Sequence, residues 1–532
     1  MASAPPSALR WLGPLGLAAS AVAVNGYSFG TTDQAIHLTF LRVLTDPGTL
    51  AGDLVADHAA AHPSLWWHLL APLVGALGWE RLPALYLGAW LAALAATFLL
   101  LHRLAEALHG RTWLALVAPA LLVAFRLCPG HVRTFEPELI NRTLAEPLLL
   151  GALLLGLRGR VVLAATIAGL AADLHATTAL HGAVGLAGLA LADPALRRRW
   201  PAMAGAFLLA AAPLGVLLAR RGAGPLWVDA AWWQVLAWRM PHHLMPARWP
   251  AGLWILAGLQ LTLWVMGAHT LAAGDVRRRA WGLVTASWAL GLGLGSLVGG
   301  PLPCAPLLAL HLPEAPLLAV ILAFLAFPAA LTALARRGRL GLVVALALAL
   351  ALLVVDEGRL AGLPRARAFT VGGPAGADRA LVDWLVAEGS GGLVAVPPAS
   401  PPWLRPWSGR ALYVTVKDGG EAVFDRTTAL AWRHRLAVAL GEDLLASPPP
   451  RGEWLGYRSV GRRAAALWEA HAASAPPSLA AEGVTVLVLD AGTAGQAARP
   501  DFAAGPWRAW RLPQATGEGA PDPGYPGGGE SP

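Results

Sequence analysis

The segment Glu314-Ala-Pro-Leu-Leu-Ala-Val-Ile-Leu-Ala-Phe-Leu-Ala-Phe-Pro-Ala-Ala-Leu-Thr-Ala-Leu334 carries no charged residue after its first position. The basic residues Arg336, Arg337 and Arg339 follow it, and a second apolar run occupies Leu340–Val355. A helix of about 20 mostly apolar residues is long enough to cross the hydrocarbon core of a bilayer. The stretch therefore predicts two membrane-spanning helices joined by a short basic turn.

The composition extends this expectation to most of the chain. Of its 532 residues, 56% are hydrophobic and only 14% are charged, whereas about a quarter of the residues in a soluble chain are charged. The 24 tryptophans fit the membrane–water interface, where Trp is enriched. The net charge is +8, but the arginines form short clusters between apolar runs rather than one stripe. That distribution argues against a nucleic-acid partner and for contact with a lipid bilayer.

Eleven apolar segments are expected to cross the membrane, which makes the chain a polytopic α-helical membrane protein. They are Leu9–Asn25, Leu82–Arg103, Thr112–Leu127, Thr143–Leu157, Val161–Leu174, Ala176–Ala192, Pro201–Leu218, Ala251–Leu271, Ala280–Val298, Glu314–Leu334 and Leu340–Val355. A further apolar stretch, Ser64–Trp79, is ambiguous. We expect it to be a juxtamembrane or re-entrant helix on the outer face, because only then do the arginine clusters between the other apolar segments all lie on one side of the membrane.

Those clusters define the expected topology. They are Arg103/Arg111, Arg158/Arg160, Arg197/Arg198/Arg199, Arg277/Arg278/Arg279 and Arg336/Arg337/Arg339. Basic loops face the cytoplasm, so the N-terminus with Arg10 is expected inside a bacterial inner membrane and the C-terminal part outside it. Arg220 and Arg221 fall on the outer side, against the rule.

Three regions are expected along the chain. Residues 1–356 form the membrane domain, with a large outer loop at 26–81. In residues 357–512 long apolar runs stop, and helices at 378–388, 427–440 and 459–473 alternate with buried strands at 392–396, 411–416 and 484–489. This pattern predicts a small α/β domain with a structural or regulatory role on the outer side. The Gly-, Pro- and acid-rich residues 513–532 are expected to be disordered.

The strongest local signal is Tyr27-Ser-Phe-Gly-Thr-Thr-Asp-Gln-Ala-Ile-His-Leu-Thr-Phe-Leu-Arg42, which begins where the first span ends. Asp33 stands at the start of an amphipathic helix, with Thr31 or Thr32 as its N-cap. A carboxylate at the membrane surface can act as a general base or hold a cation. Asp33 can also simply favour the positive end of the helix dipole.

Other polar residues on the outer side have two interpretations each. Asp53, with Asp57 and His58, either holds a divalent cation or belongs to an ordinary turn. Arg142, which follows Glu136, either binds a phosphate or reaches toward lipid headgroups. Asp173, His175 and His181 interrupt an apolar hairpin, where ionisable groups either serve a function or bond backbone carbonyls and pin the two helices.

The order of these features resembles the GT-C superfamily of membrane glycosyltransferases. More narrowly, several short motifs resemble an uncharacterised bacterial family of GT-C-like membrane proteins. They are Phe29-Gly-Thr-Thr-Asp33-Gln, Asp46-Pro, Gly52-Asp53, Val396-Pro-Pro, Ser408-Gly-Arg410, Val416-Lys417 and Trp432-Arg-His-Arg435. Asp33 is followed by Gln34, so the first loop lacks the Asp-x-Asp or Asp-Glu pair of the better-known branches.

The resemblance implies transfer of a sugar from a polyprenyl-phosphate donor to an acceptor on the outer side. It implies that Asp33 is the key catalytic acid, with Asp53 or Glu136 assisting or holding a divalent metal ion. Arg142, His175 and Arg248 would meet the donor phosphate, and His37 and His181 complete the substrate-binding candidates.

Two other functions remain open from the sequence. The chain can be a non-catalytic membrane scaffold that presents its α/β domain outside, or, less in keeping with its lack of internal repeats, a transporter. An enzyme should gather Asp33, an arginine and a His or Glu around one groove on the outer side. A scaffold has no need to do so.

Overall fold

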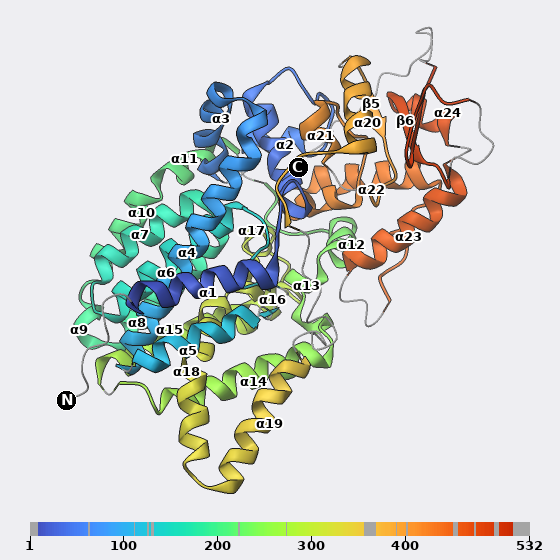
Figure 1. Cartoon of the computed structure of the whole chain (residues 1–532). Coiled ribbons are helices and arrows are strands. Elements are labelled where there is room, and N and C mark those ends of the chain that lie inside the picture. The colour runs from blue at the N-terminus through green and yellow to red at the C-terminus, as the bar shows by residue number, and fades with distance from the viewer. Residues whose placement is uncertain are drawn as a thin grey trace.

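The computed structural model describes residues 9–61, 64–110, 112–124, 127–128, 132–221, 224–272, 274–355, 369–389, 391–400, 403–450, 456–472, 475–493 and 499–513. Helices dominate the fold, and a small sheet lies near the C-terminal end of the chain (Figure 1). The tail that the sequence predicts to be disordered lies, from residue 514 on, outside the described residues.

The apolar segments of the first 355 residues form helices. Their bounds are α1 (Leu9–Asn25), α2 (Thr32–Thr45), α3 (Leu65–Leu77), α4 (Leu82–His109), α5 (Thr112–Ala124), α6 (Asn141–Leu157), α7 (Val161–Leu174), α8 (Ala176–Ala192), α9 (Pro194–Arg197), α10 (Trp200–Ala210), α11 (Ala212–Arg221), α12 (Ala230–Arg239), α13 (Pro241–Leu244), α14 (Ala251–Ala268), α15 (Asp275–Trp288), α16 (Gly295–Val298), α17 (Ala305–Leu308), α18 (Leu317–Ala335) and α19 (Arg339–Val355). Short turns of helix lie at Ala56–Ala61, Trp79–Arg81, Pro246–Arg248 and Leu312–Glu314, and the two-residue strands are β1 (Tyr27–Ser28), β2 (Leu127–Cys128) and β3 (Val132–Arg133).

Four helices in the described part of the chain are long and apolar enough to cross a membrane. They are Trp79–His109, Ala251–Ala268, Asp275–Val298 and Ala305–Ala335, and the bent pair Trp200–Ala210 and Ala212–Arg220 would make a fifth. Shorter apolar helices occupy Leu65–Leu77, Leu114–Val123, Val161–Leu174, Ala176–Ala192 and Arg339–Ala351. The chain is therefore a helical protein with several candidate membrane spans, and the number of eleven crossings stays a prediction.

Two expected spans are interrupted. The segment expected at Pro201–Leu218 is divided by a 59° bend into α10 and α11. Pro213, in the first turn of α11, lacks the N–H that would continue the hydrogen bonding of α10. The segment expected at Ala280–Val298 contains a π-helical turn, Ala289–Leu294, and such turns are often found at functional sites.

Small residues let α8 and α15 pack closely. A Cβ atom added to Gly188 would lie 2.4 Å from the carbonyl oxygen of Gly282, and one added to Gly282 would lie 2.3 Å from the carbonyl oxygen of Gly188. Close approach of backbones at small residues is a main source of helix association in membranes, where the hydrophobic effect between helices is weak.

We expect Gly188→Leu to destabilise the protein by about 1–3 kcal/mol, because the added side chain forces α8 and α15 apart. The measurement is thermal unfolding of the purified protein in detergent. Gly205→Leu on α10 is the control, since a Cβ atom there meets nothing within 4 Å. Equal unfolding temperatures for the two variants would contradict this account of the α8–α15 contact.

The C-terminal part is an α/β structure. Its elements are β4 (Phe369–Thr370), α20 (Gly376–Ala387), β5 (Leu393–Ala395), α21 (Leu404–Ser408), a 3-10 helix at Val416–Val423, α22 (Arg426–Leu440), α23 (Gly456–His471), α24 (Pro476–Ala481), β6 (Val484–Asp490), β7 (Phe502–Ala504) and β8 (Trp507–Arg511). The strand order is β5-β6-β8-β7, with β5 and β6 parallel and the other neighbours antiparallel.

The strand expected at 411–416 is wrong. Only Leu412 pairs with a neighbour, through an isolated bridge to Val394. The N–H of Leu412 donates to the carboxylate of Asp53 at 2.8 Å, and a 3-10 helix begins at Val416. A side chain from the segment between α1 and α4 therefore takes the hydrogen bond that an extended ladder would use. Strands β7 and β8 were not expected.

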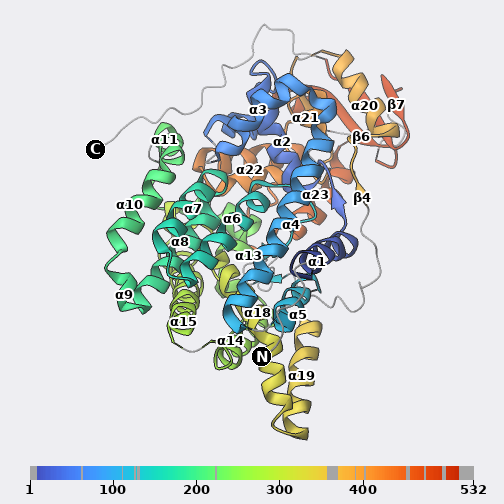
Figure 2. The ribbon, with the colours of Figure 1, turned by 60° about the vertical axis from the view of Figure 1, so that its left-hand side comes forward.

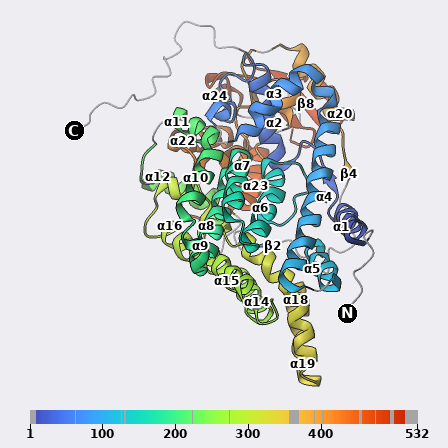
Figure 3. The same ribbon diagram turned by 90° about the vertical axis from the view of Figure 1, so that its left-hand side faces the viewer.

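The C-terminal part packs against the segment between α1 and α4 and against α12. Tyr27 of β1 pairs with Phe369 of β4, and the buried side chains of Trp232 and Trp238 on α12 share one core with Trp432 and Trp468. In Figures 2 and 3 this part lies with α2 and α3 at one end of the molecule, and α19 extends from the opposite end. The candidate site lies where the C-terminal part meets the loop.

Candidate functional site

Asp33 lies in the first turn of α2, at the surface beside the C-terminal part. Its side chain is 53% exposed and forms an ion pair with Lys417. The neighbouring Gln34 is buried, with its amide accepting from the N–H of Gly30 and donating to the carbonyl of Leu139 at 2.8 Å. Gln34 therefore fixes the start of α2.

Lys417 is the only lysine in the chain. Its ammonium holds the pKa of the Asp33 carboxyl well below its ordinary value, and the charge of Arg142 acts in the same direction. Asp33 is therefore ionised at neutral pH. From the sequence, Lys417 was noted only within a short motif, and no role in the site was predicted for it.

His37 lies one turn after Asp33 on the same face of α2. Its ring packs against Trp67 at 4.7 Å between centroids. Burial lowers the pKa of His37 to about 4, so the imidazole is neutral at pH 7. It can take part in hydrogen bonding there but adds no positive charge.

Arg142 lies at the start of α6 between two carboxylates. It forms an ion pair with Glu136, and its Nε atom lies 3.9 Å from Glu146. Arg142 also interacts electrostatically with Glu314 and Asp33. Glu136 and Arg142, both predicted from the sequence as site residues, are thus brought together as an ion pair.

His175 ends α7 and caps the start of α8. Its Nδ1 accepts the backbone N–H of Thr178 at 3.2 Å and lies 2.7 Å from the hydroxyl of the same residue. Because a backbone N–H can only donate, Nδ1 carries no proton, and the neutral ring bears its proton on Nε2. His175 interacts electrostatically with Arg142, Glu314 and His37, so it belongs to the same cluster.

A second buried group adjoins this cluster. Glu314 lies 2.8 Å from Nδ1 of His243 and 3.2 Å from Nδ1 of His311. His311 has a φ of 47°, an uncommon conformation for a residue with a side chain. Gly291 of the π turn packs closely on Pro316, which follows Glu314.

Glu314 was not predicted as a site residue. The available signal was an acid at the head of a long apolar segment, together with the His242-His243 pair between α12 and α14.

Three candidates from the sequence lie outside this cluster. Asp53 is fully buried, and hydrogen bonds from Arg405 and from backbone N–H groups surround its carboxylate. That leaves no free lone pair directed at a substrate, so we assign it a structural role. His181 binds the carbonyl of Leu310 at 3.0 Å and so pins α8 to the turn before Leu312. Arg248 is half-buried between α13 and α14, and burial lowers its pKa.

The described residues contain no group of three or more His, Cys, Asp or Glu side chains that could hold a metal ion. The divalent ion that the sequence left possible stays a prediction. A scan against protein-family models and a search of curated proteins gave no match to this chain. Its function is therefore inferred from the site.

Proposed function

We propose that this chain is a GT-C-type membrane glycosyltransferase that takes a sugar from a polyprenyl-phosphate donor on the outer face of the membrane. The observation that carries the proposal is the half-exposed Asp33 carboxylate paired with Lys417. Arg142 and His175, from two further segments of the chain, act electrostatically in the same cluster. A scaffold does not need a carboxylate and several cationic or polar groups in one cluster, whereas transfer from a phosphate donor needs both a base and cations.

The proposed chemistry divides these residues into two sets. Asp33 takes the proton of the acceptor hydroxyl, whose oxygen bonds to the anomeric carbon while the bond to the donor phosphate breaks. The leaving phosphate carries negative charge away from that bond. Lys417 and Arg142 are the cations that can stabilise it, and the Nε2–H of His175 is a neutral donor.

The proposed topology has eleven crossings, with the N-terminus inside and the C-terminal part outside. The helix α19, which follows the basic turn Arg336–Arg339, extends at the opposite end of the molecule from the C-terminal part (Figure 3). This separation supports a cytoplasmic arginine turn and an outward-facing site. Transfer of radiolabelled sugar from a polyprenyl-phosphate pool, in membranes with the protein or its Asp33→Asn variant, tests the function.

The pH dependence of transfer should report the Asp33–Lys417 pair. Lys417 is the largest cause of the lowered pKa of Asp33, so removing its ammonium in Lys417→Met should raise that pKa. The acidic limb of the pH–rate profile should then move to higher pH, because the base is lost at a higher pH as the solution is acidified. Lys417→Arg keeps the charge and should keep the limb near its original position. An unshifted limb in Lys417→Met would contradict the pairing.

A further inference from the structure

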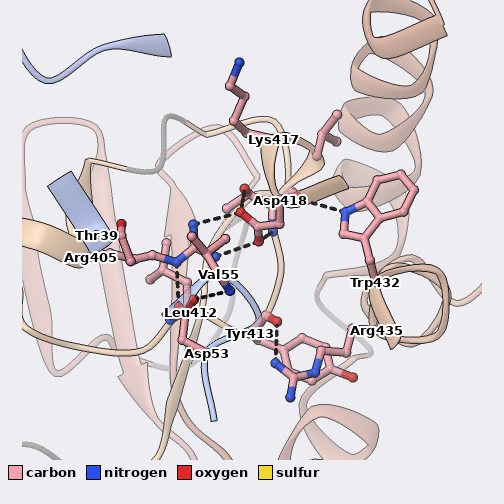
Figure 4. Close-up of polar contacts among 12 residues, drawn as sticks. Thr39, Asp53, Val55, Arg405, Leu412, Tyr413, Lys417, Asp418, Trp432 and Arg435 are labelled. Atoms are coloured by element: carbon pink, nitrogen blue, oxygen red, sulfur yellow. Dashed lines mark hydrogen bonds and ion pairs between the residues drawn. The ribbon is translucent and has the colours of Figure 1, made fainter. Parts of the chain in front are cut away.

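The segment Thr415–Gly419 carries Lys417 in the first turn of a 3-10 helix. Asp418 accepts from the backbone N–H and the hydroxyl of Thr415, both at 2.7 Å, which closes the turn on itself. The side chain of Lys417 points away from Asp418 (Figure 4). The turn therefore presents Lys417 on one side and anchors Asp418 on the other.

Arg405 of α21 binds Asp418, the anchored residue of the turn. Its guanidinium donates to both carboxylate oxygens of Asp418, at 2.8 and 2.6 Å, and to Asp53 at 2.5 Å (Figure 4). All three side chains are fully buried. Asp53 also accepts from the backbone N–H of Val55 at 2.9 Å, so one arginine joins the segment between α1 and α4 to the Lys417 turn.

Two more side chains bind the backbone of the turn. The buried Arg239 at the end of α12 donates to the carbonyl of Val416 at 3.1 Å and to that of Lys417 at 3.4 Å. The indole of Trp432 donates to the carbonyl of Thr415 at 2.9 Å. A Cβ atom on Gly419 would lie 2.7 Å from that indole, so the ring also limits the other end of the segment.

We propose that Arg239 and Arg405 are positioning residues, which fix the segment Thr415–Gly419 so that the Lys417 ammonium stands at Asp33. This inference rests on the proposed function for its catalytic meaning. It makes the C-terminal part a component of the site rather than a separate domain. Short motifs noted in the sequence belong to the same assembly, since Arg435 binds the carbonyl of Gly52 at 2.9 Å.

The single lysine makes a direct test possible. Apart from the N-terminal amine, Lys417 is the only primary amine in the full-length protein, so its rate of acylation by a water-soluble amine reagent can be followed by mass spectrometry. In the wild-type background, Asp33→Asn should raise this rate, by up to about fivefold for an ion pair of this exposure. In the Arg239→Met background, Asp33→Asn should change it little, because the pair is already lost.

The quantity to compare is the acylation rate with Asp33→Asn divided by the rate with Asp33 intact, taken once in the wild-type and once in the Arg239→Met background. Comparing these two ratios removes any direct effect of the Arg239 charge on the amine. Arg433→Met is the matched control. Arg433 donates to Asp443 at 2.6 Å and to Gln234 of α12 at 3.4 Å, and neither contact involves the segment Thr415–Gly419. It should keep the wild-type ratio. Thr415→Val, which removes one hydrogen bond inside the turn, provides a second variant if Arg239→Met does not fold.

A wild-type ratio that persists in both Arg239→Met and Thr415→Val would overturn the proposal. So would a ratio near one in the wild-type background, since the pair would then be absent. The labelling needs no sugar donor. A failed transfer assay with the expected labelling would reject the function while leaving the positioning intact.

Discussion

Asp33→Asn is expected to lower the rate of sugar transfer by a factor of about one hundred or more. A positioned general base contributes about 10²–10⁴ to a reaction rate, and the asparagine amide cannot take the acceptor proton. Asparagine is close to aspartate in shape and keeps an oxygen that can accept from Lys417. The loss should therefore appear in the rate of the bound complex rather than in the amount of folded protein in the membrane.

Asp46→Asn is the matched control for this variant. Asp46 follows the end of the same helix, is equally exposed at 53%, and has an arginine partner, Arg42, at 3.8 Å. It should transfer sugar at the wild-type rate. Equal rates for the Asp33 and Asp46 variants would remove Asp33 from the chemistry. A wild-type protein that transfers nothing from a broad donor panel would favour the scaffold hypothesis and direct attention to partners of the C-terminal part.

The helices could be predicted from the sequence because their cause is local. Leu9–Asn25, Val161–Leu174 and Ala176–Ala192 have the expected bounds, since an apolar run between polar residues determines each of them. The bend between α10 and α11 and the failed strand at 411–416 were not predicted. The bend lies beside Pro213, and the strand fails because the distant Asp53 carboxylate takes the N–H of Leu412.

The site could be predicted only in part. Asp33, His37, Arg142 and His175 were selected because each is an ionisable group beside an apolar helix, and the structure brings them into one cluster. Lys417 was missed as their partner because it lies 384 residues from Asp33 along the chain. The ion pair of Asp53 was not predicted for the same reason, because Arg405, its partner, lies 352 residues away.

The free energy of unfolding should fall by about 3–5 kcal/mol in Arg405→Met. Removing one member of a buried ion network leaves its partners charged and without compensation, and this costs far more than the net gain from the intact network. In this variant Asp53 and Asp418, which are both fully buried, would lose the only guanidinium that binds the two of them. The measurement is thermal or denaturant unfolding of the full-length protein in detergent.

Arg379→Met is the comparison that separates burial from the mere loss of an ion pair. Arg379 pairs with Asp383 at 2.8 Å, but both side chains are more than half exposed, at 58% and 57%. Water compensates exposed charges, so this variant should lie within about 1 kcal/mol of wild type. If Arg405→Met were equally mild, a buried charge network would not hold the segment between α1 and α4 to the Lys417 turn. If Arg405→Met is costly and Arg379→Met is not, the three charges that link Asp53 to the Lys417 turn are a condition for the site to form.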